Sequence, residues 1–304
     1  MIDVVETFEA NRSRLAQIAY RMLGSVAEAE DVVQEAWLRF SSVDDLGPLR
    51  NPAAWLTTTT TRLAIDRLRS AQSMREQYVG PWLPEPVITD DDPADRVVLA
   101  ESLTLAFLTM LERLDPVERA AFVLREVFAL AYADIAETLE RSETACRQLV
   151  HRAKKRLAPT GPPRYEATEE EEQRLLDGFF GAVFSGDLDA LTEVLAADVV
   201  AWSDGGADRR AARRPVVGRD RVAPYVANLS ARYLQDPDAD VELRLVRLNG
   251  QPGVIVSVDG DVELAIAFEI GSEGIAALRS VLNPRKLDHL RGPPQAAAVT
   301  DESR

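Results

Sequence analysis

Residues 114–157 read LDPVERAAFVLREVFALAYADIAETLERSETACRQLVHRAKKRL, and this stretch decides how the chain is understood. Its last part predicts a helix that begins after Ser142, because a serine side chain can cap free backbone N–H groups. Glu143 follows at the positive end of the helix dipole, where an acid is favourable. Apolar residues then recur at every fourth position and predict one inward stripe, formed by Ala145, Leu149, Ala153 and Leu157.

A shorter helix is predicted just upstream, at residues 132–139 (YADIAETL), with Ile135, Ala136 and Leu139 facing inward. Residues 140–142 have the right length for a tight turn between the two helices. Two helices joined by a short turn are typical of a helix-turn-helix. Glu140 stands in the turn, where many such motifs carry glycine.

The outward face of the second helix is basic, although the whole chain has a net charge of −15. From residue 144 to residue 164 the chain has bases and no acid. These cations would neutralise phosphates, and Arg147, Gln148 and Arg152 could pair with base edges in a major groove. The alternative is a solvated helix face that is basic because the last turns of a helix favour cations.

Length and composition predict a globular protein of two or three domains, with 304 residues of which 46% are hydrophobic. A single cysteine, Cys146, cannot form an internal disulfide and indicates a reducing cytosol, where it is expected to be a packing residue. The sequence shows no apolar run near twenty residues and no leader pattern, so we expect a cytoplasmic protein. The acidic balance argues against indiscriminate nucleic-acid binding.

The first 77 residues have a helical pattern throughout. Apolar residues from Phe8 to Met22 predict a first helix that ends at Gly24. A second helix follows through EAEDVVQEAWLRF, and its inward positions are Val32, Val33, Ala36, Trp37 and Phe40. Pro52 suits the first turn of a third helix, AAWLTTTTTRLAIDRLRSAQSMRE. Five consecutive threonines are poor helix formers, so packing or function must hold that turn.

Four segments, AEDVVQEAWLRF, NPAAWL, RLAIDRLRS and VHRAKKRL, together resemble the extracytoplasmic-function sigma factors of the sigma-70 family. The resemblance covers residues 1–158 and implies a subunit that binds core RNA polymerase and promoter DNA, with no cofactor. In that family the second helix docks on the clamp helices of the β′ subunit, and the β subunit is a further partner. This implies polymerase contacts for Asp31, Gln34, Glu35 and Trp37.

The same resemblance implies two DNA-reading helices. The third helix and the loop before it would melt and read the minus-ten element, as cations beside an aromatic surface allow, with Trp55, Arg62, Asp66, Arg67 and Arg69. Many relatives carry asparagine where this chain has Arg62. The last helix of the helix-turn-helix would read the minus-thirty-five element with Thr144, Arg147, Gln148, His151, Arg152, Lys154 and Lys155.

Between these parts lies VGPWLPEP at residues 79–86, followed by an acidic run. Its three prolines exclude a helix and favour a stiff, extended segment. A plain linker would join the two parts as well. A large apolar side chain such as Trp82, however, gains no burial free energy in a solvated linker, so Trp82 predicts a surface on which the linker docks. WLPEP is similar to a signature of the sigma-factor subgroup with a SnoaL-like C-terminal extension, which implies regulatory contacts for Trp82, Pro84 and Glu85.

From Thr168 the pattern changes to two helices followed by strands with alternating apolar residues near 241–245, 254–258 and 262–270, separated by Asn-Gly and Asp-Gly turns. This predicts an α+β domain with an antiparallel sheet, and it resembles the cone-shaped SnoaL-like fold. Two further segments resemble subgroup motifs, and this resemblance implies that they also make regulatory contacts: Asp204, Gly205 and Gly206, and Asn283, Pro284, Lys286 and Leu287. Ala207 and Asp208 depart from the first motif.

Enzymes of that fold use an Asp or His base in a pocket, for which Asp204 and His289 are the candidates here. Because no partner base, oxyanion donors or metal-ligand spacing accompanies them, we expect no catalytic and no metal residues. The pocket could still hold an unknown small molecule. A basic run, formed by Arg209, Arg210, Arg213, Arg214, Arg219 and Arg221, would either face the acids at residues 90–95 or form a solvated loop.

The predicted organisation is thus multidomain, with two all-α domains followed by an α+β SnoaL-like domain. The expected boundaries are sigma region 2 at 1–78, a proline- and acid-rich linker at 79–100, sigma region 4 at 101–158, a second linker at 159–167, the SnoaL-like domain at 168–290 and a disordered tail at 291–304. Two functions are open: a sigma factor regulated by its C-terminal domain, or a ligand-responsive helix-turn-helix regulator with a binding or enzymatic domain. The N-terminal helices favour the first, because a conventional regulator needs no polymerase-docking helix.

Overall fold

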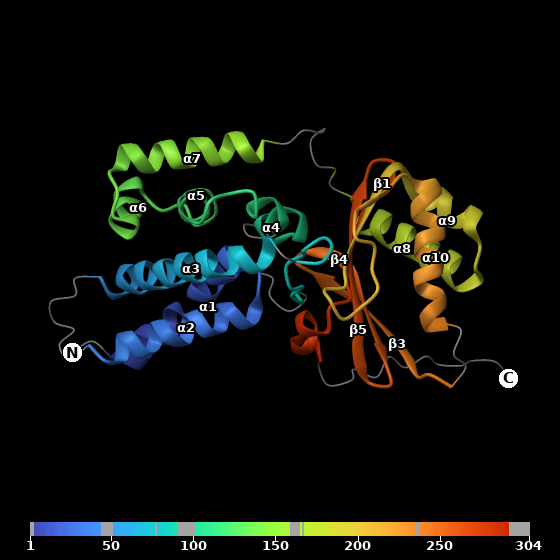
Figure 1. The fold of residues 1–304 in the computed structure, drawn as a ribbon, viewed down its shortest axis with the longest axis horizontal. Coiled ribbons are helices and arrows are strands. Elements are labelled where there is room, and N and C mark those ends of the chain that lie inside the picture. Colours follow the sequence, from blue (N-terminus) through green and yellow to red (C-terminus); the bar gives the residue numbers. More distant parts are fainter. Residues whose placement is uncertain are drawn as a thin grey trace.

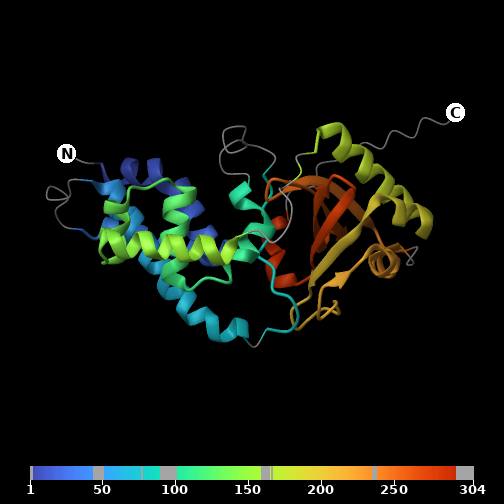
Figure 2. The ribbon, with the colours of Figure 1, turned by 90° about the horizontal axis from the view of Figure 1, so that it is seen from above.

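The computed structural model describes residues 3–43, 51–76, 78–89, 101–158, 165, 167–234 and 238–291. A helical half and an α+β half lie side by side along the long axis of the molecule (Figure 1), and the view from above shows the same division (Figure 2). The predicted fold class is therefore confirmed. In the part of the chain that is described, no helix is long and apolar enough to span a membrane.

The first three helices are α1 (Val4–Leu23), α2 (Val26–Ser41) and α3 (Pro52–Glu76). Asp3 caps α1 by accepting from two backbone N–H groups, and Ser25 caps α2 by accepting from the N–H of Glu28. The threonine run lies within α3, where Thr57, Thr60 and Thr61 are buried. The hydroxyls of Thr57 and Thr61 donate to carbonyls one turn back, so packing holds these poor helix formers in place.

The second helical group comprises a 3-10 turn (Glu101–Leu103), α4 (Leu105–Leu111), α5 (Pro116–Phe122), a π-helical turn (Val123–Val127), α6 (Tyr132–Leu139) and α7 (Glu143–Leu157). The predicted helix-turn-helix is confirmed as α6 and α7, and Ser142 caps α7. Helices from both groups share one hydrophobic core, which includes Leu15 and Ile18 of α1 together with Leu108, Ile135 and Val150.

The predicted inward stripe of α7 was partly wrong. The buried residues are Cys146, Val150, Ala153 and Leu157, whereas Ala145 and Leu149 are only half-buried. Residues four apart drift by about 40° around a helix, so a strict four-residue repeat leaves the inward face, and a mixed four- and three-residue repeat follows it. Burial also raises the pKa of the Cys146 thiol, in keeping with a packing role.

The C-terminal half contains α8 (Glu169–Ser185), α9 (Leu188–Val194), α10 (Arg219–Leu234) and one six-stranded sheet in the order β2-β1-β6-β5-β4-β3. The strands are β1 (Leu195–Asp204), β2 (Val216–Val217), β3 (Val241–Leu248), β4 (Gln251–Val258), β5 (Asp261–Gly271) and β6 (Gly274–Val281). The two predicted turns join β3 to β4 and β4 to β5. The three predicted strands pair antiparallel, as expected. The full sheet adds one parallel pairing, because a third hairpin leads from β5 to β6 and places β6 parallel to β1.

Both faces of this sheet are covered, which sets the position of every site in this half. Val254 and Val256 of β4 belong to the core under α8–α10, whereas Ile255 between them belongs to a core on the opposite face. That opposite core includes Leu83 of the linker, Leu105 of α4 and Leu287. Figure 1 shows the helices on the outer side of the sheet and the helical half on the inner side.

Candidate promoter, polymerase and linker sites

Helix α2 presents the residues expected to contact polymerase. Asp31 and Gln34 are exposed and Glu35 is half-buried. Asp31 forms an ion pair with Arg67 of α3 at 3.6 Å, so the predicted polymerase and minus-ten surfaces adjoin. Trp37 is half-buried, and its ring centroid lies 4.9 Å from that of Phe8.

Leu38 on the same helix is 53% exposed and was missed by the sequence reasoning. Its position beside the acidic residues gives this helix an apolar contact surface. The residue type alone did not show that Leu38 is exposed, because a leucine in an amphipathic helix can lie on either face.

Helix α3 carries the candidate minus-ten residues in two different environments. Asp66, Arg67 and Arg69 are exposed, and Arg69 pairs with Asp66 at 3.3 Å. Trp55 is half-buried, with its ring centroid 5.7 Å from that of Phe40. Arg62, by contrast, is directed to the end of α6, where its guanidinium donates to the carbonyl oxygens of residues 137 and 138.

Helix α7 presents its predicted minus-thirty-five residues to solvent, since Thr144, Arg147, Gln148, His151, Arg152, Lys154 and Lys155 are all exposed. Several of these cations are held by acids. Arg147 pairs with Glu143 at 2.7 Å, and Lys154 pairs with Glu126 at 2.7 Å. Ion pairs of this kind orient the side chains along the helix surface.

Glu118 of α5 is a positioning residue that the sequence reasoning missed. Its buried carboxylate accepts a hydrogen bond from Arg152 Nε at 2.9 Å and a second from Arg156. The distance of 34 positions between Glu118 and Arg152 leaves no periodic signal in the sequence.

The linker crosses the inner face of the C-terminal domain, where Leu83, Pro84, Glu85 and Pro86 are buried. The N–H of Leu83 donates to Asp204 Oδ2 at 2.8 Å, and Lys286 Nζ donates to the carbonyl oxygen of Leu83. Lys286 also pairs with Asp204 at 2.8 Å, and both side chains are almost fully buried. One residue of each C-terminal motif, Asp204 and Lys286, therefore binds the backbone of Leu83 in the linker.

Two aromatic rings cover this charge pair. Lys286 Nζ lies 4.2 Å from the centroid of the Trp82 ring and 5.0 Å from that of Tyr78. The Tyr78 hydroxyl donates to Asp204 Oδ1 at 2.5 Å and accepts from Asn283 Nδ2 at 2.7 Å. Burial, reinforced by the hydrogen bond to Asp204, raises the pKa of Tyr78, so its hydroxyl stays protonated as a donor.

Trp82 also packs on α1. Gly24 ends α1 with a φ of 68°, and a Cβ at this position would lie 2.7 Å from the Trp82 ring. Gly24 is therefore needed both for its left-handed backbone and for the close approach of the ring. Gly206 has a similar double role, because its φ is 58° and a Cβ there would lie 2.7 Å from Asn283.

We call the cluster around Leu83, Asp204 and Lys286 the linker site, and the remaining motif residues complete it. Gly205 is in close contact with the backbone of Arg209. Pro284 begins a 3-10 turn (Pro284–Lys286) that brings Lys286 inward, and Leu287 is buried behind it. A second 3-10 turn (Asp288–Leu290) follows.

Glu85 joins the linker to the helical half. Its carboxylate accepts from the N–H of Val26 at 2.6 Å, at the start of α2, and its own N–H donates to the carbonyl of Gly24 at 2.8 Å. The Tyr20 hydroxyl donates to the carbonyl oxygen of Glu85 at 2.6 Å. Burial raises the pKa of Tyr20, which keeps this donor protonated.

Asn249, in the turn between β3 and β4, connects three parts of the chain. Its Nδ2 donates to the Tyr20 hydroxyl at 2.8 Å and to the carbonyl oxygen of Leu103 at 2.9 Å, and its Oδ1 accepts from the N–H of Val87 at 2.9 Å. Sequence reasoning took Asn249 for a turn residue only, and it missed Tyr20 and Tyr78 as contacts of the linker.

Comparisons with known proteins agree with this geometry. Residues 7–74 match the family described as Sigma-70 region 2, and residues 104–157 match Sigma-70, region 4. The chain is 40% identical to the ECF RNA polymerase sigma factor SigJ of Mycobacterium tuberculosis, over 93% of this chain and 92% of that protein. This chain belongs to the extracytoplasmic-function sigma factors.

Two further likenesses support the assignment of this sigma factor. It is 30% identical to SigG of Mycobacterium tuberculosis, over 86% of this chain and 75% of that protein. The crystal structure of Mycobacterium tuberculosis SigJ matches with a TM-score of 0.72 and 35% identity, covering 95% of this chain and 99% of that one. The likeness to SigJ extends through the C-terminal domain.

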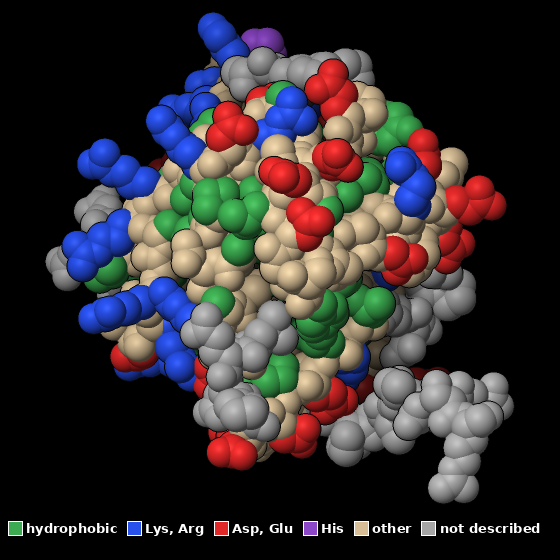
Figure 3. All heavy atoms as spheres, turned by 90° about the vertical axis from the view of Figure 1, so that its right-hand side faces the viewer, with side chains coloured by type: hydrophobic (Ala, Val, Ile, Leu, Met, Phe, Trp, Pro, Cys, Tyr) green, Lys and Arg blue, Asp and Glu red, His purple; other side chains and the backbone are tan. Residues whose placement is uncertain are grey.

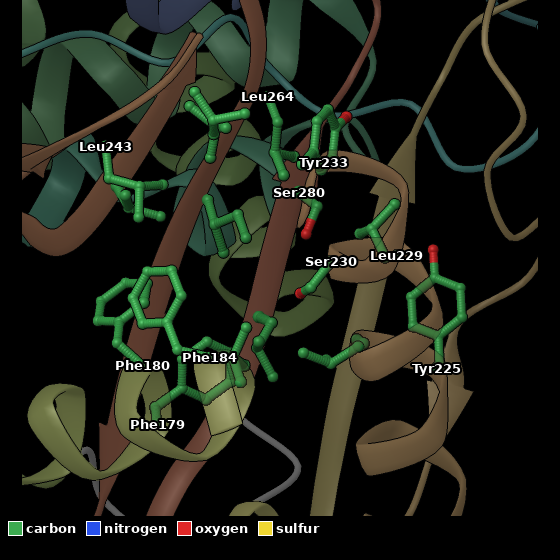
Figure 4. Close-up of a pocket in the computed structure, with 18 residues that line it drawn as sticks. Phe179, Phe180, Phe184, Tyr225, Leu229, Ser230, Tyr233, Leu243, Leu264 and Ser280 are labelled. Carbon is green, nitrogen blue, oxygen red and sulfur yellow. The ribbon is translucent and has the colours of Figure 1, made fainter. Parts of the chain in front are cut away.

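The C-terminal domain of the sigma factor also contains an apolar pocket between α8, α10 and the outer face of the sheet (Figure 4). Apolar side chains dominate its lining, and the polar groups are hydroxyls. The labelled lining residues come from α8, α10 and the strands, and they are Phe179, Phe180, Phe184, Tyr225, Leu229, Ser230, Tyr233, Leu243, Leu264 and Ser280.

Neither candidate base of the sigma factor lines this pocket. Asp204 is paired with Lys286, and His289 Nε2 lies 2.7 Å from the carbonyl oxygen of Pro86, so both belong to the linker site on the other face of the sheet. Among the described residues, no group of histidine, cysteine or carboxylate side chains could hold a metal ion.

The predicted basic run lies on the surface of the sigma factor. Its six arginines are exposed, and Arg209 pairs with Glu263 of β5. Figure 3 shows Lys and Arg side chains gathered along one edge of the outer face of this domain, with acids on the middle and opposite edge. The acids at 90–95 and the tail after residue 291 lie outside the described residues.

Proposed function

We propose that this sigma factor docks on core RNA polymerase through α2, reads the minus-ten element with α3 and the minus-thirty-five element with α7, and is regulated by its C-terminal domain. Polymerase docking uses Asp31, Gln34 and Glu35, with Leu38 as an added apolar contact on the β′ clamp helices. The exposed cations of α7 support a DNA-reading role, because Arg and Lys neutralise phosphates and Arg also pairs with guanine. Such a subunit acts in the cytoplasm, where its polymerase is.

One observation supports the regulatory role: residues 83–86 of the linker are buried against the C-terminal domain. Leu83 and Glu85 are 1% and 8% exposed, and their backbone groups are bound by residues of both halves of the protein. A domain that holds this linker restricts how far apart the two DNA-reading helices can move.

Run-off transcription with core polymerase on a promoter library tests both statements. The full chain should initiate at a subset of promoters, and a chain ending before Thr168 should initiate at a markedly different rate while still binding core enzyme. A matched control ends after residue 291 and removes only the tail, which should change the rate less. Equal rates for all three proteins at every promoter would contradict the regulatory role, and no initiation at any promoter would contradict the sigma-factor role of this chain.

We also propose that the apolar pocket binds a small, neutral, largely apolar molecule and does not catalyse a reaction. Its lining includes no acid, base, histidine or cysteine, so nothing in it can act as a general base near neutral pH. Burial raises the pKa of Tyr233, which keeps that hydroxyl neutral.

Native mass spectrometry of the purified full chain, before and after extraction with organic solvent, tests this binding. Leu229→Trp should fill the pocket and abolish any adduct, whereas Leu188→Trp, on the exposed surface of α9, should leave it unchanged. An adduct that survives Leu229→Trp would place the ligand elsewhere.

A further inference from the structure

Arg62 of α3 and the end of α6 form a contact between the two DNA-binding parts. Arg62 Nε donates to the carbonyl oxygen of Thr138 at 2.9 Å, and Nη2 donates to that of Glu137 at 3.1 Å. Arg62 Nη1 also pairs with Glu140 Oε1 at 2.9 Å. Beside it, the hydroxyls of Thr58 and Thr138 lie 3.0 Å apart. We call these four residues, Thr58, Arg62, Thr138 and Glu140, the interdomain lock.

The lock uses the C-terminal end of α6 as its binding partner. The last carbonyl groups of a helix lack intrahelical donors and carry the negative end of the helix dipole, so a guanidinium is favourable there. The backbone N–H groups of Glu140 and Arg141 cap α6 from within its own segment. The Arg62 guanidinium adds a cation from another domain, and this addition lasts only while α3 and α6 are together.

Glu140 occupies a position that disfavours its own side chain. Its φ is 53°, in the left-handed region that glycine adopts more readily. A glycine would satisfy the turn but could not bind Arg62. Arg62 of the DNA-reading helix and Glu140 of the turn therefore meet in one ion pair.

The locked arrangement is incompatible with reading a whole promoter. Elements centred 10 and 35 base pairs before the start site lie roughly 85 Å apart along the DNA axis, at 3.4 Å per base pair. Here α5 packs against both α3 and α7, and two helix packing distances put their axes only about 20 Å apart. The parts that carry α3 and α7 must separate before both elements can be bound, and the lock must break when they do.

We propose that the pair Arg62 and Glu140 is a reversible autoinhibitory lock, which holds the two DNA-binding parts together in the free protein and releases Arg62 for the minus-ten element on promoter binding. This inference rests on the proposed roles of α3 and α7. The pair is suited to release because Arg62 and Glu140 are 44% and 76% exposed, so water and salt screen their attraction.

The test compares Glu140→Gln and Glu140→Gly with Glu137→Gln in the full chain. Both Glu140 variants remove the ion pair, and the glycine variant also relieves the left-handed backbone, so misfolding cannot explain a shared effect. Glu137 contributes its carbonyl oxygen to the lock, so Glu137→Gln removes a neighbouring charge and keeps the contact. Spin labels at Arg12→Cys and Ala133→Cys, both exposed, report the distance between α1 and α6, while native Cys146 is buried.

We expect the fraction of molecules with a long distance to rise by about two- to fivefold in both Glu140 variants, as for loss of an exposed ion pair, and to stay constant in Glu137→Gln. Promoter complexes with core polymerase should form faster by a similar factor. Unchanged distances in both Glu140 variants, or an equal change in the control, would overturn the lock. If the variants open but no variant and no wild-type protein initiates transcription, the lock stands and the proposed function fails.

Discussion

Two of the ion-pair contacts between parts of the protein, the one in the linker site and the one in the interdomain lock, differ most in burial. In the linker site, Lys286 and Asp204 are 8% and 0% exposed and are surrounded by further hydrogen bonds, whereas the lock pair lies largely in solvent. Removing one partner of a buried ion pair costs about 3–5 kcal/mol, but an exposed pair contributes about 1 kcal/mol or less. The linker site is therefore a fixed joint, and the interdomain lock is a releasable one.

The difference follows from where the charges sit in the fold. The inner face of the sheet and the linker exclude water from Lys286, so its charge depends on Asp204 and on the carbonyl of Leu83. At the end of α6, water can replace either partner of the lock when it opens. An ion pair between a basic and an acidic side chain is thus a structural joint when it is buried, as for Lys286 and Asp204, and a switch when it is exposed, as for Arg62 and Glu140.

The largest expected effect is that of Lys286→Met, which leaves Asp204 buried without its cation. The free energy of unfolding of the full chain should fall by about 3–5 kcal/mol in urea titrations. The neighbouring Arg285→Met is the matched control, because Arg285 is 84% exposed and its pair with Asp208 is long, at 3.6 Å. A loss below about 1 kcal/mol for Lys286→Met would show that this joint is no firmer than an exposed pair.

A second test replaces glycines at two helix ends with alanine. Gly186 ends α8 with a φ of 69° and has open space around it, so Gly186→Ala should cost about 1–2 kcal/mol from the backbone alone. Gly24 has nearly the same φ but also touches Trp82, so Gly24→Ala should lose about 1–3 kcal/mol more. Equal losses in thermal unfolding would mean that Trp82 does not press on α1.

A third variant weakens the joint without changing a charge. Asn249→Gly keeps the turn, whose φ of 53° suits glycine, but removes the donors to Tyr20 and to the carbonyl of Leu103. We expect a loss of about 1–3 kcal/mol in the free energy of unfolding, because the buried hydroxyl and carbonyl lose a partner. Asn228→Ala, which removes an exposed bond within α10, should lose well under 1 kcal/mol; if the two losses match, Asn249 is only a turn residue.

The smallest effect on stability is expected for the exposed pairs of α7. Arg147→Ala should change the free energy of unfolding by less than about 0.5 kcal/mol, yet weaken binding to the cognate minus-thirty-five element by about 1–3 kcal/mol and relax its specificity. Lys155→Ala should weaken all sequences alike and flatten the salt dependence. Identical behaviour of the two variants across promoter sequences, in fluorescence anisotropy titrations, would show that Arg147 does not read bases.

Local features of the fold could be predicted from sequence because short-range physics determines them. Ser142 caps its helix, and Asn249-Gly250 and Asp259-Gly260 form hairpin turns, since each depends only on neighbouring residues. Helix α10 was missed because Pro224 lies inside it and arginines crowd its start. Strand β6 and its parallel pairing with β1 depend on the return of the chain across the whole domain.

The contacts of the linker were only partly predictable. Trp82 and the two C-terminal motifs were recognised as special, but not that Asp204, Tyr78 and Lys286 form one buried cluster. Tyr20 and Asn249 are 229 positions apart, so no sequence pattern links them. The Asn-Gly turn was also a sufficient reason for an asparagine at position 249. The lock was hidden for the same reason, because Arg62 suits a DNA-reading helix whether or not it also binds α6.

The most direct test of the account measures both contacts in one protein, free and bound to core polymerase with promoter DNA. Spin labels at Arg12→Cys and Ala133→Cys span the interdomain lock, and labels at Arg12→Cys and Glu242→Cys span the linker joint between α1 and the C-terminal sheet. The account predicts that the first distance grows by tens of ångströms in the promoter complex, toward the separation of the two elements, while the second stays the same. A constant first distance, or any comparable change in the second distance, would contradict it.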